Sequence, residues 1–120
     1  MMLSFEQTPE FKKDLKALSK RWRSLESDIA SAEAALRVIY SGEEEIYRQF
    51  FALNRATVIT KTETAEAVKM RLDCKSIGND KKTRLVFVTV KTEGTIKFVE
   101  LYAKNEKPRE DTKRIKKYLS

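Results

Sequence analysis

The chain has 120 residues, and its 25 lysines and arginines against 18 aspartates and glutamates give a formal charge of +7. This length favours a single domain with one core, and 41% hydrophobic residues with three glycines and two prolines exclude a disordered or fibrous protein. Its longest apolar run, residues 85–88, is far shorter than the roughly 20 residues of a membrane span, and residues 1–6 show no signal-peptide pattern. The single cysteine, Cys74, has no partner for an internal disulfide. We therefore expect a soluble cytoplasmic domain with neither a membrane nor a disulfide-linked partner.

Histidine is absent from the sequence, and this narrows the chemistry that the chain can perform. Imidazole is the usual general base near neutral pH and the commonest metal ligand. Without it the chain has no Ser-His-Asp or Cys-His arrangement and no ordinary zinc site. We expect no metal and no other cofactor, and an enzyme of this composition would move protons through lysine, carboxylate or tyrosine side chains.

The basic excess belongs to the second part of the chain. Residues 68–120 hold 15 lysines and arginines against seven acidic residues, whereas residues 1–67 hold 10 against 11. A local excess of this size favours a polyanionic partner such as nucleic acid, or an acidic protein. The alternative is an ordinary lysine-rich surface, since small domains often carry net charges of about 2–8.

The first residues predict a strand and the start of a helix. Residues 3–7 alternate between apolar and polar side chains, as a short strand does. Thr8 has the character of a helix cap, Pro9 suits the first helical position, and Glu10 suits the positive end of the helix dipole.

Helical periodicity continues from this start over residues 11–39, where apolar residues recur every three or four positions. One long helix has the same pattern, but we favour two antiparallel helices with a break near Ser24, and Gly42 as the end of the second. Residues 43–67 are interpreted as a family-variable insertion whose aromatic residues cover the core. Within it, residues 57–60 fit either a strand or a loop.

From Val68 onward the period changes from 3.6 to 2, which indicates strands. Residues 76–81 and the Glu93-Gly94 pair have the composition of turns. The predicted elements are strands at residues 68–74, 84–90 and 95–103, the second of them covered on both faces, and a short helix that opens at Pro108. The whole chain, residues 1–120, is therefore predicted to be one α+β domain: an N-terminal strand, a two-helix hairpin, a three-stranded antiparallel sheet and a short C-terminal helix.

Alternation places Lys69 and Arg71 on one face of the first of these strands, and hairpin pairing brings Arg84, Tyr102 and Lys104 near them. Several cations and a tyrosine on one face could bind phosphates, stack on an unpaired base, or stabilise a phosphorane during RNA cleavage. A solvated strand face, an arginine that pairs with an acid, and a tyrosine that only packs are the plainer alternatives.

Three segments at these strands resemble the RelE/ParE superfamily of toxins from bacterial type II toxin–antitoxin systems. They are VKMRL at 68–72, KTRLVF at 82–87 and ELYAKNEK at 100–107, and the segment FKKDLKAL at 11–18 is similar to the family's first helix. The resemblance implies an antiparallel sheet against two helices and neutralisation by an acidic or amphipathic antitoxin. In the RelE branch it also implies cleavage of mRNA in the ribosomal A site by 2′-oxygen attack, without a metal.

The resemblance also assigns residues. Lys69 and Arg71 match the paired basic positions on the family's second strand, and Arg84 matches the arginine that contacts the scissile phosphate. Lys104 and Lys107 fall in the basic cluster that binds RNA after the last strand.

Three positions depart from the RelE pattern. RelE has a lysine where this chain has Arg71, and an arginine cannot act as a general base. Asn105 stands where an arginine is expected. Asp111 lies nearest to the position of a terminal tyrosine, for which Tyr102 or Tyr118 is the candidate substitute.

Three functions remain open. The first is a ribosome-dependent mRNA endoribonuclease, with Lys69 as base or phosphate ligand, Arg71 and Arg84 as phosphate and transition-state ligands, and Tyr102 or Lys104 as orienting or stacking groups. The second is a non-enzymatic DNA gyrase poison like the ParE branch, although such a poison needs no clustered cations on this strand. The third is a degenerate toxin that acts as a binding or regulatory partner.

Overall fold

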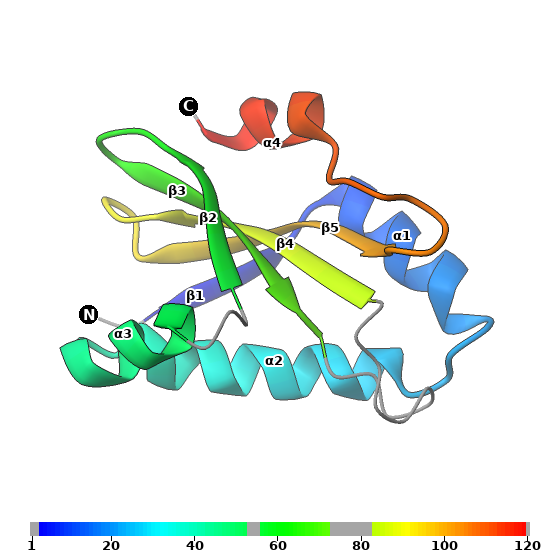
Figure 1. Cartoon of the computed structure of the whole chain (residues 1–120), viewed down its shortest axis with the longest axis horizontal. Coiled ribbons are helices and arrows are strands. Elements are labelled where there is room, and N and C mark those ends of the chain that lie inside the picture. The colour runs from blue at the N-terminus through cyan, green and yellow to red at the C-terminus, as the bar shows by residue number, and fades with distance from the viewer. Residues whose placement is uncertain (1–2, 53–55, 73–82, 120) are drawn as a thin grey trace.

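The computed structural model describes residues 3–52, 56–72 and 83–119, which form four helices and five strands (Figure 1). In chain order they are β1 (Ser4–Gln7), α1 (Pro9–Ser19), α2 (Leu25–Ile39), α3 (Glu44–Ala52), β2 (Ala56–Lys61), β3 (Ala65–Arg71), β4 (Thr83–Val90), β5 (Thr95–Ala103) and α4 (Thr112–Leu119). None of the helices in these ranges is long and apolar enough to cross a membrane. The α+β class predicted from the sequence is confirmed.

The five strands form one mixed sheet in the order β1-β5-β4-β3-β2. β1 pairs with β5 in parallel, and the other neighbours are antiparallel. The expected three-stranded sheet is therefore too small. The run of β-branched residues at 57–60 is a strand and extends the sheet beyond β3, while β1 adds an edge at the other side.

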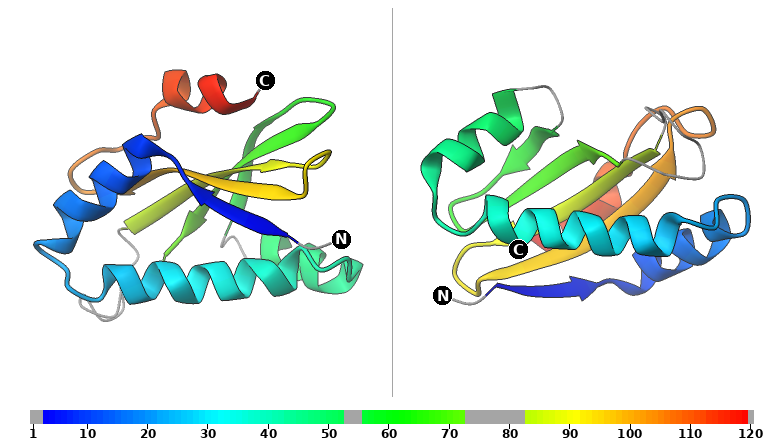
Figure 2. Two further views of the ribbon diagram at one scale, coloured as in Figure 1. Left: turned by 180° about the vertical axis from the view of Figure 1, so that it is seen from behind. Right: turned by 90° about the horizontal axis from the view of Figure 1, so that it is seen from below.

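Helices cover the two faces of the sheet unequally (Figures 1 and 2). α1 and α2 lie on one face, where Phe11, Leu36, Phe87 and Phe98 belong to the larger core cluster. α4 lies on the opposite face, and we call this the α4 face. There a smaller cluster joins Ile115 and Leu119 of α4 to alanines and valines of β3, β4 and β5. Because both faces are covered, β4 is almost wholly buried, as its sequence predicted.

The start of α1 follows the sequence rules. Thr8 Oγ1 accepts a hydrogen bond from the Phe11 amide at 3.2 Å and donates one to the Phe98 carbonyl at 3.0 Å, and Pro9 occupies the first turn. Thr8 thus caps the helix and also ties it to β5.

The break between the first two helices is also as expected. α1 ends at Ser19 and α2 begins at Leu25, with Ser24 at the capping position. The Ser24 hydroxyl donates to Asp28 at 2.7 Å rather than accepting from a backbone amide, so its capping role differs from the one expected. Gly42, beyond the end of α2, has a φ of 106°, a conformation that favours glycine.

The described residues of the segment 43–67 form regular structure. They form α3, β2 and the first residues of β3, which begins at Ala65 and not at Val68. The expectation that their aromatic residues cover the core holds for Phe50, which is buried in the larger cluster, and for Phe51, which packs against it.

Two further expectations need correction or lie outside the described residues. The terminal helix begins at Thr112 instead of Pro108, because the backbone amide of Asp111 is held by Glu100 and the Asp111 carboxylate accepts from the Arg114 amide at the first turn. The strand expected at residues 68–74 ends at Arg71 as β3, and the last two residues expected for it, 73 and 74, fall outside the described ranges together with the turn at residues 76–81.

Candidate functional site

The pairing of the three central strands aligns three of the candidate side chains in one row. Arg71 on β3 lies opposite Arg84 on β4, and Arg84 lies opposite Tyr102 on β5. Residues opposite one another in a sheet project to the same face. The row therefore crosses the α4 face at one end of the sheet, where β3 and β5 finish and β4 begins.

Exposure differs sharply along this row. Arg71 is exposed at the outer position, whereas 8% of Arg84 and 5% of Tyr102 are accessible to solvent. Arg84 Nη1 donates a hydrogen bond to the Thr83 carbonyl at 3.0 Å. The row thus offers one exposed guanidinium beside one that is held deep in the sheet.

Lys69 and Tyr102 meet on a single carboxylate, that of Glu110. Lys69 Nζ lies 3.1 Å from Glu110 Oε2, and the Tyr102 hydroxyl donates to the same oxygen at 3.5 Å. Burial acts to raise the pKa of Glu110, but its own backbone amide and Lys69 outweigh this and hold it below its ordinary value. Glu110 is therefore a charged carboxylate at neutral pH.

Burial is also the main reason why the pKa of Tyr102 is raised to about 12. The negative charges of Glu110 and Glu100 act in the same direction, and the charge of Arg84 opposes them. The phenol consequently stays protonated at neutral pH and acts as a hydrogen-bond donor.

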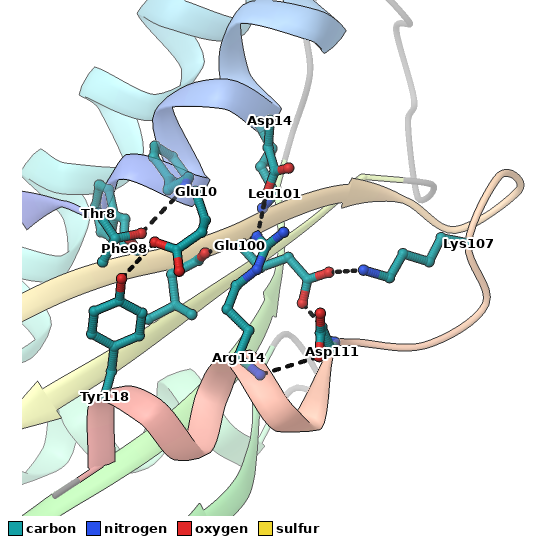
Figure 3. Close-up of polar contacts among 12 residues, drawn as sticks. Thr8, Glu10, Asp14, Phe98, Glu100, Leu101, Lys107, Asp111, Arg114 and Tyr118 are labelled. Atoms are coloured by element: carbon teal, nitrogen blue, oxygen red, sulfur yellow. Dashed lines mark hydrogen bonds and ion pairs between the residues drawn. The ribbon is translucent and has the colours of Figure 1, made fainter.

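Glu100, on β5, holds together the segment between that strand and α4 (Figure 3). Only 1% of its surface is exposed, and its carboxylate pairs with Lys107 and accepts the Asp111 amide at 2.8 Å. Lys107 Nζ also lies 5.9 Å from the centroid of the Tyr102 ring. This buried carboxylate therefore fixes Lys107 and Asp111, two residues of the segment between β5 and α4, and Lys107 lies next to Tyr102 of the row.

A second set of polar contacts anchors α4 to α1 (Figure 3). Arg114 Nη1 lies 2.7 Å from Asp14 Oδ2 and donates to the Val99 carbonyl at 3.1 Å, while the same Asp14 oxygen accepts the Leu101 amide. Burial acts to lower the pKa of Arg114, but Asp14 outweighs it and raises the value.

Further along α4, the Tyr118 hydroxyl donates to Glu10 at 2.5 Å, and Lys117 lies 2.8 Å from the same carboxylate. Tyr118 is thus committed to the contact with α1, away from the row. Of the two tyrosines named as substitutes for the family's terminal residue, Tyr102 is the one on the row.

The candidate residues chosen from the sequence divide into two groups. The structure brings Lys69, Arg71, Arg84 and Tyr102 together on the α4 face. Lys104 and Lys107 lie in the segment after β5, where Lys104 is exposed and Lys107 pairs with Glu100.

The sequence reasoning missed the two carboxylates of this site. Glu100 carried a signal, since it is a lone charge within the apolar run of residues 98–101. Glu110 carried no such signal in the sequence, because its approach to Lys69 depends on the path of the chain before α4. Asp111, which the resemblance puts nearest to the position of a terminal tyrosine, caps α4 through the Arg114 amide at 3.1 Å.

The side chains of this site could hold a ligand through charge and hydrogen bonds. Lys69 pairs with Glu110 and Lys107 with Glu100, while Arg71 and Arg84 lie on the row beside them. Over residues 3–52, 56–72 and 83–119, no three His, Cys, Asp or Glu side chains gather as metal ligands would. Such a surface suits a phosphate or another anion.

Comparison with known proteins adds information on the fold. No protein-family model matches the sequence, and no curated protein matches it. Among solved structures, a chain of the archaeal RelE–RelB complex from Pyrococcus horikoshii OT3 is similar, with a TM-score of 0.57 and 16% sequence identity. The match covers 86% of this chain and 96% of that chain. The chain therefore has a RelE-like fold.

Proposed function

We propose that this chain is the toxin of a type II toxin–antitoxin system and that it stops translation by cutting mRNA on the ribosome. The RelE-like fold supports the class of protein. One observation carries the chemistry: the strand register aligns Arg71, Arg84 and Tyr102 on the α4 face, with Lys69 beside them. The protein would act in the cytoplasm, and an acidic or amphipathic antitoxin would complement the basic second part of the chain.

Cleavage by the RNA's own 2′-oxygen needs charge stabilisation on the phosphorane and proton transfer at both ends of the reaction. Arg71 is exposed and would bind the scissile phosphate, while the deeper Arg84 would stabilise the charge that develops on it. Neither arginine can remove a proton. Both therefore act as electrostatic ligands.

Proton transfer falls to Lys69 and Tyr102. Because the pKa of Tyr102 is raised to about 12, its hydroxyl would donate a hydrogen bond or a proton to the leaving 5′-oxygen. A phosphate oxygen carries negative charge as the Glu110 carboxylate does, so bound RNA would take the place of Glu110 beside Lys69 and Tyr102. Lys69 then serves as base or phosphate ligand, and Lys104 and Lys107 would contact the RNA backbone.

Induced expression in a bacterial host without an antitoxin tests this proposal, with primer extension on host mRNAs. The wild-type chain should arrest growth and produce new, codon-phased mRNA ends. Arg71→Ala and Arg84→Ala should abolish both effects, and Arg48→Ala is the matched control, since Arg48 is an exposed arginine on α3 that pairs with Glu44. A fully toxic, RNA-cleaving Arg84→Ala variant would refute the proposal.

Arg84 is buried, so its removal can disturb the fold as well as the chemistry. Urea unfolding of purified Arg84→Ala separates the two effects, and Arg71→Ala removes an exposed side chain with little expected change in stability. If Arg71→Ala cleaves mRNA as the wild type does, and Arg84→Ala is inactive only because it is unfolded, the row has no catalytic role.

Substitution of Lys69 by arginine distinguishes its two roles. Lys69→Arg keeps a cation next to Glu110 but removes the capacity to act as a base. Retained mRNA cleavage would assign Lys69 to phosphate binding, whereas a variant that folds but does not cleave would assign it to proton transfer.

The other two functions are outcomes of the same expression experiment. Growth arrest with intact mRNA would favour inhibition of DNA gyrase, and a supercoiling assay with purified protein would then test this function. Absence of growth arrest would favour a degenerate toxin that binds or regulates, in keeping with the helix-capping role of Asp111 at the position of the family's tyrosine.

A further inference from the structure

A hollow lies at the other end of the sheet from the Arg71–Arg84–Tyr102 row, beside α3. It has a volume of about 460 Å³, which is within the roughly 300–1,000 Å³ of small-molecule sites. The aromatic and charged residues that line it are Tyr40 after α2, Tyr47 on α3, Glu66 on β3 and Lys91 after β4. Its lining also includes apolar side chains such as Leu3 and Ile96. None of these residues has a role in the proposed ribonuclease site.

Glu66 is the main polar group of this hollow. Only 7% of the residue is exposed, yet it carries an acidic side chain within the sheet. Its Oε1 lies 3.3 Å from Lys91 Nζ, and its Oε2 accepts from the Tyr47 hydroxyl at 3.5 Å. The side chain of Lys91 is 58% exposed, so this partner is a rim lysine that solvent reaches freely. A buried carboxylate is energetically costly unless a cation pairs with it. Here that cation is the solvent-exposed ammonium group of Lys91, which another cation could replace.

Two tyrosine rings form a wall next to this carboxylate. Tyr40 and Tyr47 meet edge to face, with ring centroids 5.6 Å apart and planes at 75°. The Tyr40 hydroxyl is buried and has no hydrogen-bond partner among the described residues. Burial raises the pKa values of both phenols, so they are neutral hydroxyls at physiological pH. Aromatic faces beside a carboxylate attract organic cations, and the Tyr40 hydroxyl can accept an N–H hydrogen bond from one.

Two further carboxylates lie near the tyrosines of this hollow. Glu43 and Glu44 line an adjoining hollow that also includes Tyr40 and Tyr47. A phosphate would meet these carboxylates and Glu66, whereas a cation is attracted to them.

We propose that this hollow is a binding site for a small organic cation with an alkyl body, of the primary ammonium type. The ammonium would replace Lys91 at Glu66 and reach the Tyr40 hydroxyl, and the alkyl part would lie against the apolar side chains. This assignment is independent of the ribonuclease proposal. It gives a role to Tyr47 and Glu66, two residues of the segment 43–67 to which the sequence assigned no chemistry.

Titration of the full chain with n-butylammonium chloride tests the proposal, followed by ¹H–¹⁵N spectra at constant ionic strength. The amide signals of Glu66, Thr89 and Thr95 should shift and saturate. n-Butanol, which has the same body and no charge, should produce no saturable shift. Equal binding of n-butanol would overturn the proposal, as would the absence of any saturable shift with n-butylammonium.

Two variants and a control make the test specific. Glu66→Gln should weaken n-butylammonium binding about tenfold or more, as expected for a hydrogen bond to a charged group. Glu45→Gln removes one charge from the exposed surface of α3 and should leave the affinity unchanged. Lys91→Ala should tighten binding, because it removes the cation that competes for Glu66. Unchanged affinity in Glu66→Gln, or weaker binding in Lys91→Ala, would contradict the proposal, and the substitution at exposed Lys91 keeps the proposal testable even if Glu66→Gln fails to fold.

Discussion

The contact between Asp14 and Arg114 should stabilise the protein more than an ordinary surface ion pair does. A single oxygen of Asp14 accepts from the Leu101 amide at 3.1 Å and from Arg114 at 2.7 Å, so one carboxylate joins α1, β5 and α4. The side chains are only 23% and 19% exposed, which limits screening by solvent. A hydrogen bond to a charged group contributes about 1.5–3 kcal/mol.

We therefore expect Asp14→Asn to lower the free energy of unfolding by about 2 kcal/mol, since the amide oxygen keeps the Leu101 contact but loses the charge. In a double-mutant cycle with Arg114→Gln, measured by urea unfolding at neutral pH, the coupling energy should be about 1–2 kcal/mol. The pair between Glu44 and Arg48 on α3 is the matched control. Its side chains are 82% and 68% exposed, and a coupling of at most about 0.5 kcal/mol is expected.

Equal coupling energies for the two pairs would refute this reasoning, because burial would then have no influence on the strength of the interaction. A coupling near zero for Asp14 and Arg114 would show that this ion pair does not help to hold α4 in place.

Three further predictions concern other contacts of α1 and α4. Ile115→Ala should lower the free energy of unfolding by about 2–3 kcal/mol in urea, because Ile115 is 2% exposed against the sheet, while the exposed Lys113→Ala should change it by less than about 0.5 kcal/mol. Hydrogen bonds from Lys117 and then Tyr118 lower the pKa of Glu10 from 4.5 to about 2. A depressed folded-state pKa gives stability that is present above about pH 4.5 and lost as the pH falls toward 2, so wild type and Glu10→Gln should differ in unfolding free energy at pH 6 and converge near pH 2. Thr8→Ala should cost about 1–2 kcal/mol in unfolding free energy, and Thr8→Ser much less, because serine keeps the hydroxyl that caps α1; equal losses would contradict the capping role.

Much of the fold follows from local patterns in the sequence. The cap at Thr8 and Pro9, the apolar period over residues 11–39 and the buried run of β4 each reflect chemistry within a few residues of chain. The number of strands in the sheet could not be predicted from local patterns, because a strand such as β2 is defined by its pairing with β3 rather than by its own alternation. The start of α4 was misplaced for a similar reason, since Asp111 is fixed by Glu100, eleven residues away.

The same distinction applies to the candidate site. Alternation and hairpin pairing were sufficient to predict that Lys69, Arg71, Arg84 and Tyr102 share one face, because strand geometry dictates it. The carboxylate of Glu110 could not be predicted. Glu110 lies 41 residues after Lys69 in the sequence, and the segment before α4 that brings it to Lys69 has no regular structure. No periodic pattern of residues encodes the path of such a segment.

The parallel pairing of β1 with β5 affects how the protein assembles while it is synthesised. Ser4 lies next to Thr95, 91 residues later in the chain, so β1 must wait until β5 has been made before it can enter the sheet. Contacts between such distant residues slow folding, because a long loop must close before they form. The row of Arg71, Arg84 and Tyr102 also needs β5. Until β5 has been synthesised, a nascent chain therefore exposes α1 and α2 without a complete sheet, and β1 and the cationic row take their places together once β5 is present.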